Sequence, residues 1–268
     1  MTALPLDLEA ALEARLRYYR DLGIVSLYRR CEPNSLLELA PAIPSNPALE
    51  AAIFTQKSSP ESLFAEPESS AVPAEGRVAA LESIRADIGD CKRCPLAFQG
   101  RHKIVFADGD PNARLMFVGE GPGADEDAQG LPFVGRAGQL LNNMINAMGL
   151  QRSDVYIANV VKCRPPQNRT PEPVEANTCM QFLWRQIEVV NPQVIVALGS
   201  TAATHLLGAK SSLAGLRGRI HQVRDSQLIV TYHPAYLLRD PRQKAEAWKD
   251  LQIAMKELGL KPQKPAKS

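Results

Sequence analysis

Four short apolar runs alternate with helical patterns along the chain, and this order limits the folds that it can adopt. The runs cover residues 113–118, 155–161, 193–198 and 227–232, and the helical patterns between them cover residues 138–148, 173–190 and 201–207. Continuous apolar strands separated by helices are typical of a parallel sheet covered on both faces. We therefore predict an α/β fold: a three-layer α/β/α domain around a central, mainly parallel sheet of four strands.

A polar residue lies at or just past the end of each predicted strand. In chain order these residues are Glu120, Asn159, Ser200 and His233. Ligands of parallel sheets bind at the carboxyl ends of the strands, so we expect all four side chains around a pocket at one edge. Residues 119–138, which follow the first strand, are rich in glycine, and glycine lets backbone approach a ligand closely. Their spacing matches neither a dinucleotide fingerprint nor a phosphate-binding loop.

The side chains expected at this edge suit a flat heterocyclic base. The amide of Asn159 can pair with N3 and O4 of uracil or, when flipped, with cytosine. Phe133 would stack on the base, a contact worth about 1–3 kcal/mol. His233 would donate to a carbonyl oxygen that becomes negative as a glycosidic bond breaks, and Glu120 would orient water or stabilise the sugar cation. Each residue alone also has a purely structural interpretation: Asn159 could hydrogen-bond to backbone, Phe133 could belong to the core and His233 could cap the following helix. The presence of all three together favours the pocket.

Three segments resemble the signature regions of the family 4 uracil-DNA glycosylases, iron–sulfur repair enzymes within the uracil-DNA glycosylase superfamily. They are GEGPGADEDAQGLPFVGRAGQLL, NVVKCRPPQNR and HPAYLLR. The resemblance implies a monofunctional enzyme of base excision repair, which hydrolyses the N-glycosidic bond of deoxyuridine in DNA, releases uracil and leaves an abasic site. It implies catalytic roles for Glu120, Asn159 and His233. It implies a uracil pocket of Gly121, Glu126, Phe133, Asn159 and His233, in which Glu126 crowds out the methyl group of thymine.

DNA contacts are expected on two segments. The residues after His233 resemble the loop that enters DNA to fill the space left by the flipped nucleotide, which implies contacts by Leu237, Leu238 and Arg239. Arg217 and Arg219 lie among glycines and are candidates for phosphate contacts. A related branch crosslinks to DNA through a histidine in an insertion after the second motif. Residues 164–169 contain neither a histidine nor an insertion. We therefore expect the enzyme to turn over on uracil-containing DNA, single- or double-stranded, rather than to crosslink to it.

Four of the five cysteines follow a pattern that suits metal binding. Cys91 and Cys94 form a C-x-x-C pair, Cys163 follows the second motif and Cys179 comes later, whereas Cys31 stands apart. A chain of this size without a secretion signal is not expected to carry a disulfide framework. Thiolates select zinc or iron–sulfur clusters, and the spacing alone leaves both open. The family resemblance implies a structural 4Fe-4S cluster on Cys91, Cys94, Cys163 and Cys179.

Composition divides the chain into four regions. These are a helical N-terminal segment (1–40), a flexible linker rich in Pro, Ala, Ser and Glu (41–77), the catalytic domain (78–260) and a basic tail (261–268). Residues 1–77 carry 7 Lys and Arg against 11 Asp and Glu, whereas residues 78–268 carry 24 against 18. A mildly basic domain fits DNA binding. The N-terminal helix either packs on its own domain or is tethered for a repair or replication partner.

No apolar run approaches membrane length and the start lacks a basic and apolar leader, so we expect a cytoplasmic monomer that does not contact membranes. Two other functions stay open. One is a broader deaminated-base glycosylase that also accepts hypoxanthine or xanthine. The other is a non-catalytic iron–sulfur DNA-binding module, against which the joint presence of Glu120, Phe133, Asn159 and His233 counts. A lyase step would need a lysine at the pocket, and Lys162, the nearest in sequence, is not expected to serve.

Overall fold

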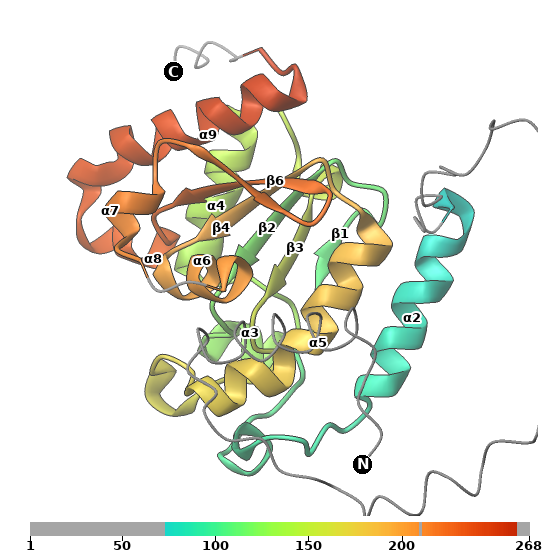
Figure 1. Cartoon of the computed structure of the whole chain (residues 1–268). Coiled ribbons are helices and arrows are strands. Elements are labelled where there is room, and N and C mark those ends of the chain that lie inside the picture. Colours follow the sequence, from blue (N-terminus) through green and yellow to red (C-terminus); the bar gives the residue numbers. More distant parts are fainter. Residues whose placement is uncertain (1–72, 209–210, 262–268) are drawn as a thin grey trace, which may run out of the picture. The chain divides into compact units, whose positions relative to one another are not determined.

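A computed structural model describes residues 73–208 and 211–261 of the chain (Figure 1). The N-terminal segment predicted for residues 1–40, the predicted linker up to residue 72 and the tail from residue 262 lie outside these residues. Residues 73–77, which the composition assigned to the linker, contain the turn η2 (Ala74–Gly76) and the first residue of helix α2 (Arg77–Ile88).

In the described part of the chain, six strands form one sheet with the order β1-β3-β2-β4-β6-β5. The strands are β1 (Asp108–Gly109), β2 (Leu115–Gly119), β3 (Tyr156–Asn159), β4 (Val194–Leu198), β5 (Ile220–Val223) and β6 (Ser226–Thr231). The inner strands β3, β2, β4 and β6 are parallel, whereas β1 and β5 pair antiparallel at the two edges. The inner strands are the four predicted from the apolar runs.

The prediction of four strands was therefore two strands short. Strand β1 has 2 residues, too few for any periodic pattern. Strand β5 lies at an edge, where Ile220 is exposed and Val223 buried, so that it shows no continuous apolar run. Edge strands with one solvated face do not give the signal on which the prediction rested.

Helices cover both faces of the sheet, which confirms the predicted three-layer α/β/α arrangement. The helices are α2 (Arg77–Ile88), α3 (Ala124–Gln129), α4 (Arg136–Ala147), α5 (Pro173–Val190), α6 (Ser200–Leu207), α7 (Leu213–Leu216), α8 (Pro234–Arg239) and α9 (Lys244–Leu258), and the short turns include η3 (Pro95–Phe98), η4 (Arg152–Asp154), η5 (Pro166–Asn168) and η6 (Pro241–Gln243). None of these described helices has the length and apolar content to span a bilayer.

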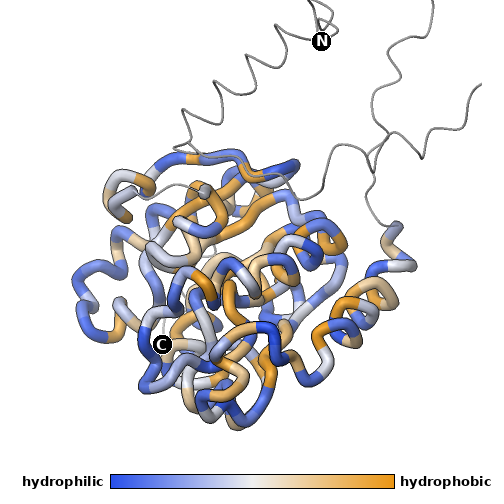
Figure 2. The backbone as a smooth tube through the Cα atoms, turned by 60° about the horizontal axis from the view of Figure 1, so that its bottom comes forward, coloured by the Kyte–Doolittle hydropathy of each residue, from blue (hydrophilic) through white to orange (hydrophobic). Residues whose placement is uncertain are grey.

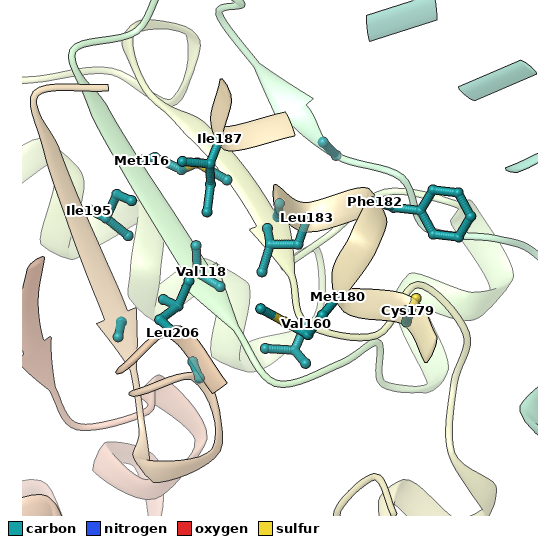
Figure 3. Close-up of a cluster of buried hydrophobic side chains, with 14 of the residues drawn as sticks. Met116, Val118, Val160, Cys179, Met180, Phe182, Leu183, Ile187, Ile195 and Leu206 are labelled. Carbon is teal, nitrogen blue, oxygen red and sulfur yellow. The ribbon is translucent and has the colours of Figure 1, made fainter. Parts of the chain in front are cut away.

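One apolar core lies between the sheet and helices α2, α5 and α6 (Figure 3). Met116 and Val118 of β2 point to this face and meet Leu183 and Ile187 of α5 and Leu206 of α6. Helix α2 packs beside α5 in Figure 1 and contributes three buried side chains, Leu81, Ile84 and Ile88.

The opposite face carries a second core beneath α4 and α9. Leu115 and Phe117, which alternate with Met116 and Val118 along β2, point to this face, and Leu141 of α4 packs there. Side chains of a strand alternate between the two faces, so β2 is buried on both. Along the tube in Figure 2, apolar segments (orange) alternate with hydrophilic segments (blue), most of which lie at the periphery.

The connections after the parallel strands position the functional edge. Between β4 and α6 the chain turns at Gly199, whose φ of 91° is accessible to glycine at little cost. Helix α5 begins at Pro173, preceded by Glu172, whose N–H donates to the Glu175 carboxylate at 2.7 Å. Because the four inner strands run parallel, the segments that follow them meet at one edge of the sheet.

Candidate active site

A cavity of about 850 Å³ opens at the carboxyl edge of the sheet. Its walls include Glu120 after β2, Asn159 at the end of β3, Ser200 after β4 and His233 after β6. The glycine-rich segment after β2 supplies a further wall, which includes Phe133. The structure thus brings together the four polar residues that the sequence placed at the strand ends.

Asn159 lies in the cavity wall with its amide oxygen unpaired. The residue is 2% exposed, and Oδ1 has no hydrogen-bond partner among the described residues. A Cβ on the neighbouring Gly119 would lie 2.4 Å from this oxygen and 2.5 Å from Cζ of Phe133, so the amide and the ring meet above a residue that must be glycine. A buried acceptor without a donor costs about 1–3 kcal/mol. The oxygen is therefore suited to accept a hydrogen bond from a ligand.

Phe133 is held in an unfavourable backbone conformation. Its φ of 51° lies in the left-handed region, which bulky residues rarely adopt. The side chain is buried, packs into the core under α4 and also lines the cavity. Its ring centroid lies 5.6 Å from that of His233, with the two planes inclined by 33°. One face of the core is therefore also a wall of the cavity, as stacking on a flat ligand requires.

His233 caps helix α8 and is neutral at neutral pH. Its Nδ1 accepts a hydrogen bond from the Ala235 N–H at 3.1 Å, which leaves the ring hydrogen on Nε2. Burial lowers the pKa of His233 to about 4, and the cation of Arg239 acts in the same direction. The helix cap and the pocket residue, which the sequence presented as alternatives, are thus the same side chain. Its Nε2–H has no acceptor among the described residues and is available to a ligand.

Glu120 is fixed by a partner that the sequence did not indicate. Its Oε2 accepts a hydrogen bond of 2.5 Å from the hydroxyl of Thr201, in the first turn of α6. Residue 201 follows β4 rather than β2, so only the adjacency of these strands in the sheet could have suggested the pair. With one oxygen held, the carboxylate has a fixed orientation at the edge of the cavity.

Glu126 holds the glycine-rich segment together through its carboxylate. One oxygen accepts from the N–H groups of Val134 and Gly135 at 2.9 and 3.0 Å, and the other accepts from the Gly123 N–H at 3.1 Å. The sequence predicted a contact with the base and missed this anchoring role, although the spacing from residue 123 is that of a capping box. Gly121 also lines the cavity, where a Cβ would lie 2.7 Å from Cγ2 of Val161.

Lys162 is buried behind the site rather than exposed in it. Its ammonium donates to the backbone oxygen of Asn159 at 2.8 Å and to Oε1 of Gln186 at 2.5 Å. Burial lowers the pKa of Lys162 to about 8. The lysine does not line the cavity. It instead supports the strand end that carries Asn159.

Comparison with known proteins identifies the family. The model of the uracil DNA glycosylase superfamily matches residues 106–252, which span the cavity from the residues before β2 to helix α9. This chain belongs to the uracil-DNA glycosylase superfamily. All four strand-end residues and the complete glycine-rich segment fall within the match.

Within the superfamily, several relatives are type-4 uracil-DNA glycosylases. The protein of Thermotoga maritima is 48% identical over 60% of this chain and 84% of its own length. Those of Sulfurisphaera tokodaii and Pyrobaculum aerophilum are 40% and 42% identical, covering 69% and 64% of this chain and 87% and 91% of the relatives. A type-5 uracil-DNA glycosylase of Pyrobaculum aerophilum is 35% identical over 55% of this chain. The family 4 resemblance of the three motifs is confirmed.

The structure separates the expected DNA contacts of this superfamily member into two groups. Leu238, Arg239 and Arg219 are exposed. Leu237 is 1% exposed and belongs to the core, because it points inward from the short helix α8. Arg217 forms an ion pair with Asp250 at 2.7 Å, and its side chain is only 11% exposed. Both side chains are therefore engaged within the protein itself, and the DNA contacts expected of them stay predictions.

The cavity has a further cationic residue that was not predicted from the sequence. Arg136, the first residue of α4, is exposed, lines the cavity and has no hydrogen-bond or ion-pair partner in the described ranges. Arg169 also lines the cavity, but its guanidinium is paired with both oxygens of the buried Glu175, at 2.7 and 2.8 Å. An unpaired arginine beside a cavity is a candidate for phosphate contact, a signal that appears only once the cavity is known.

The four predicted cysteine ligands lie in one neighbourhood beside α5. Each is a free thiol, and all four belong to or pack against the core on the α2 and α5 face. Burial raises the pKa of Cys179 to about 11, and the thiols of Cys163 and Cys94 add to the shift. Cys91 and Cys94 also contribute to the raised pKa of Cys163, after burial. Among the described residues, no three His, Cys, Asp or Glu side chains stand in a metal-binding arrangement.

Three of the cysteine sulfurs accept hydrogen bonds from nitrogen donors, and the longest of these runs from Nη1 of Arg93 to Sγ of Cys91, at 3.8 Å. Arg101 donates to Sγ of Cys163 at 3.1 Å and to the Cys91 carbonyl at 2.7 Å. The Lys162 N–H donates to Sγ of Cys179 at 3.3 Å. Donors of this kind stabilise thiolates, and hydrogen bonds to sulfur are among the features that tune iron–sulfur centres.

Proposed function

We propose that this protein is a monofunctional uracil-DNA glycosylase of base excision repair, which hydrolyses the bond between uracil and deoxyribose and leaves an abasic site. The unpaired Oδ1 of Asn159 in the cavity wall carries this proposal. The N3–H of uracil supplies the donor that this oxygen lacks, and O4 of uracil accepts from the amide nitrogen. In this amide orientation cytosine would place a lone pair against Oδ1. The same contact therefore selects uracil over its parent base.

Stacking and hydrogen bonding together hold the flipped base. Phe133 provides the aromatic face, in a conformation that is already rigid before the base arrives. The base first leaves the helix at a cost of a few kcal/mol, which is lowest at mismatches and in single strands. Stacking on an aromatic side chain returns about 1–3 kcal/mol. A preformed wall therefore offsets much of the cost of flipping.

His233 stabilises the leaving group as a neutral donor. As the bond from C1′ to N1 breaks, its electron pair remains on uracil, and negative charge collects on the carbonyl oxygen O2. Because Ala235 occupies Nδ1, the hydrogen of His233 is on Nε2 and is available to that oxygen. A fixed donor aimed at developing negative charge is often worth about 2.7–4 kcal/mol.

Glu120 acts on the sugar side of the reaction. The hydroxyl of Thr201 holds one carboxylate oxygen, and the other is available to orient water or to stabilise the positive charge that develops on deoxyribose. Water adds at C1′, and the proton that it releases is taken up by the uracil anion, so that the products are an abasic site and free uracil. Glu126 faces the same cavity from the glycine-rich segment and limits the space beside the base, as exclusion of the thymine methyl group requires.

DNA is held by exposed residues of three segments, two of which, at Arg136 and Arg239, line the cavity. Leu238 fills the space left by the flipped nucleotide, and Arg239, Arg219 and Arg136 contact phosphates. Phosphate contacts make binding fall steeply with salt, on single- and double-stranded DNA alike. The proposed monomeric state and cytoplasmic location accord with the DNA substrate. A repair or replication partner for residues 1–40 concerns a segment outside the described residues.

The four cysteines fit a 4Fe-4S cluster in their donor chemistry. Cys91, Cys94, Cys163 and Cys179 are unpaired thiols that influence one another electrostatically, and N–H groups are directed at three of the sulfurs. Thiolates are the ligands that such clusters take. A cluster bound there would act as a structural cross-link, joining the segment before β2 to the segment after β3 and to α5. Hydrolysis of a glycosidic bond needs no electron, so no catalytic step passes through it.

The purified protein should release uracil from DNA. Oligonucleotides carrying one uracil, thymine, cytosine or hypoxanthine, single-stranded or paired, are incubated with the protein and treated with alkali to cleave abasic sites. We expect cleavage at uracil and none at thymine or cytosine. Hypoxanthine presents the same adjacent N–H and C=O groups on a larger ring, so cleavage there would widen the substrate class. A folded protein that binds DNA but cleaves nowhere would favour the non-catalytic module.

A further inference from the structure

The conformation of Phe133 requires support from its surroundings. A non-glycine residue in the left-handed region costs of order 1–3 kcal/mol and persists only where neighbouring groups hold it. Residue 133 has a φ of 51° and presents its ring to the cavity. If the turn relaxed, the ring would leave the position in which it faces a base. The groups that hold the turn therefore affect the site without touching the ligand.

Arg152, from the turn η4, binds the backbone of this turn directly. Its Nη1 donates to the carbonyl of Phe133 at 3.1 Å, and its Nη2 donates to the carbonyl of Pro132 at 2.6 Å. The same guanidinium is itself fixed, because Nε donates to Asp108 at 2.7 Å and Nη1 also donates to Asn142 at 3.0 Å. All three nitrogens are thus engaged, and the planar fork of arginine matches this arrangement.

The turn is held from its other side by an anion and by close packing. The carboxylate of Glu126 accepts the N–H groups of the next two residues, Val134 and Gly135. A Cβ at Gly138 would lie 1.9 Å from the carbonyl oxygen of Phe133, so α4 approaches that carbonyl closely. The guanidinium of Arg152 binds two carbonyls and the carboxylate of Glu126 binds two N–H groups, so together they fix the successive peptide groups around Phe133.

We propose that Arg152 is a positioning residue, which sets the ring of Phe133 for stacking on the flipped base. The inference rests on the proposed function, since it concerns the same pocket. Arg152 does not line the cavity and acts through the two carbonyls that it binds. Its partners lie at β1 and on α4, so it ties the edge strand of the sheet and this helix to the stacking wall.

A double-mutant cycle tests this assignment. Arg152→Met, Phe133→Ala and the double variant are compared by single-turnover uracil release at saturating enzyme, together with the enzyme concentration at half-maximal rate. Arg152→Met should slow release about tenfold, a loss of the size expected for a displaced stacking ring. In the Phe133→Ala background the same substitution should change the rate less than about twofold, because residues that act through one contact are not additive.

Arg114→Met is the matched control. Arg114 also donates to a backbone carbonyl, that of Leu258, and to Gln193, but away from the cavity. It should keep the wild-type release rate. Arg152→Lys keeps the charge and can reach one carbonyl, so it should recover part of the rate and serves if the methionine variant does not fold.

The possible failures are distinguishable. A wild-type protein that releases no uracil overturns the proposed function and this inference with it. An active wild-type protein overturns the inference alone if Arg152→Met is equally fast, or if its loss adds in full to that of Phe133→Ala. Failure of both Arg152 variants to fold would assign the residue to stability and would also overturn it.

Discussion

At the scale of single residues, the hydrogen-bonding state of His233 decides what the site can do. The Ala235 N–H occupies Nδ1, so the imidazole has one hydrogen to donate, and burial keeps the ring neutral. A neutral imidazole can stabilise a developing anion by donating this one hydrogen bond, with no change in its own protonation. The amide of Asn159 complements it with a buried oxygen that lacks a donor, which we propose accepts from the base.

His233 should not titrate near pH 6.5. Its pKa is about 4 in the folded protein against an ordinary 6.5, so between these values the unfolded chain binds a proton that the folded chain does not. Stability should therefore be unaffected by this residue above pH 6.5 and decrease as the pH falls toward 4. Nitrogen-15 NMR of the histidine rings, assigned with His233→Gln, should show the Nε2–H tautomer unchanged down to about pH 5. A resonance of His233 that titrates near pH 6.5 would refute the assignment.

The positions of site residues could be predicted where the order of strands and helices alone brings the residues together. Asn159 and His233 end parallel strands, so their convergence follows from the alternation of strands and helices. The roles of Arg217 and Leu237 could not be predicted in this way. Arg217 pairs with Asp250, which lies 33 positions later, and nothing local in the sequence marks that pair. Leu237 and Leu238 are adjacent, and only the orientation of α8 buries one and exposes the other.

At the scale of elements, helix α8 separates a buried leucine from an exposed one. It begins at Pro234 after the His233 cap and has 6 residues, so one turn carries both an inward and an outward leucine. The stack of Tyr236 on Tyr232, with ring centroids 5.1 Å apart, fixes the helix against the end of β6. The helix therefore leaves Leu238 exposed on its outward side, where we propose that it enters DNA.

Leu237→Ala should affect the stability of the protein, whereas Leu238→Ala should affect its activity on duplex DNA. Leu237→Ala removes buried methyl groups and should lower the free energy of unfolding by about 2–5 kcal/mol in urea titrations. Leu238→Ala should change it by less than about 0.5 kcal/mol, because the side chain is 37% exposed. Leu238→Ala should slow uracil release from duplex DNA more than from single strands, which leave no gap to fill. Equal slowing on both substrates would argue against insertion into the helix.

Elements that face solvent were the hardest to predict. The inner strands are buried on both faces and show continuous apolar runs. Edge strand β5 has an exposed Ile220 and pairs with β6 by backbone bonds, which leave no trace in composition. The glycines of the loop anchored by Glu126 could be recognised in the sequence, but its hydrogen bonds could not. Three backbone N–H groups meet this one carboxylate only after the turn has formed.

At the scale of the whole molecule, the cavity and the cysteine cluster both adjoin the end of strand β3. The cavity is bounded by Asn159 at the end of β3, and Cys163 follows 4 residues later beside Cys179 of α5. Lys162 connects the two regions, since its ammonium binds the Asn159 carbonyl and its N–H binds Cys179. Spacing alone could not distinguish zinc from an iron–sulfur cluster, because both take thiolates.

The protein purified without oxygen should be brown and contain about four irons per chain. Cys179→Ser should lose the colour and iron and melt at a lower temperature, because a cross-link between distant segments is lost. Cys31→Ser, which lies outside the proposed ligand set, should keep both. A colourless wild-type protein with stoichiometric zinc would contradict the cluster.

The most direct test of the central claim is uracil release by Asn159→Ala, measured under single-turnover conditions on DNA with one uracil. We expect wild type to produce alkali-labile sites at uracil and Asn159→Ala to lose at least about tenfold in rate, since an acceptor for N3–H is removed. Asn146→Ala, on the exposed side of α4, should match wild type. Full activity of a folded Asn159→Ala protein would contradict the assignment of this amide as the group that reads the base.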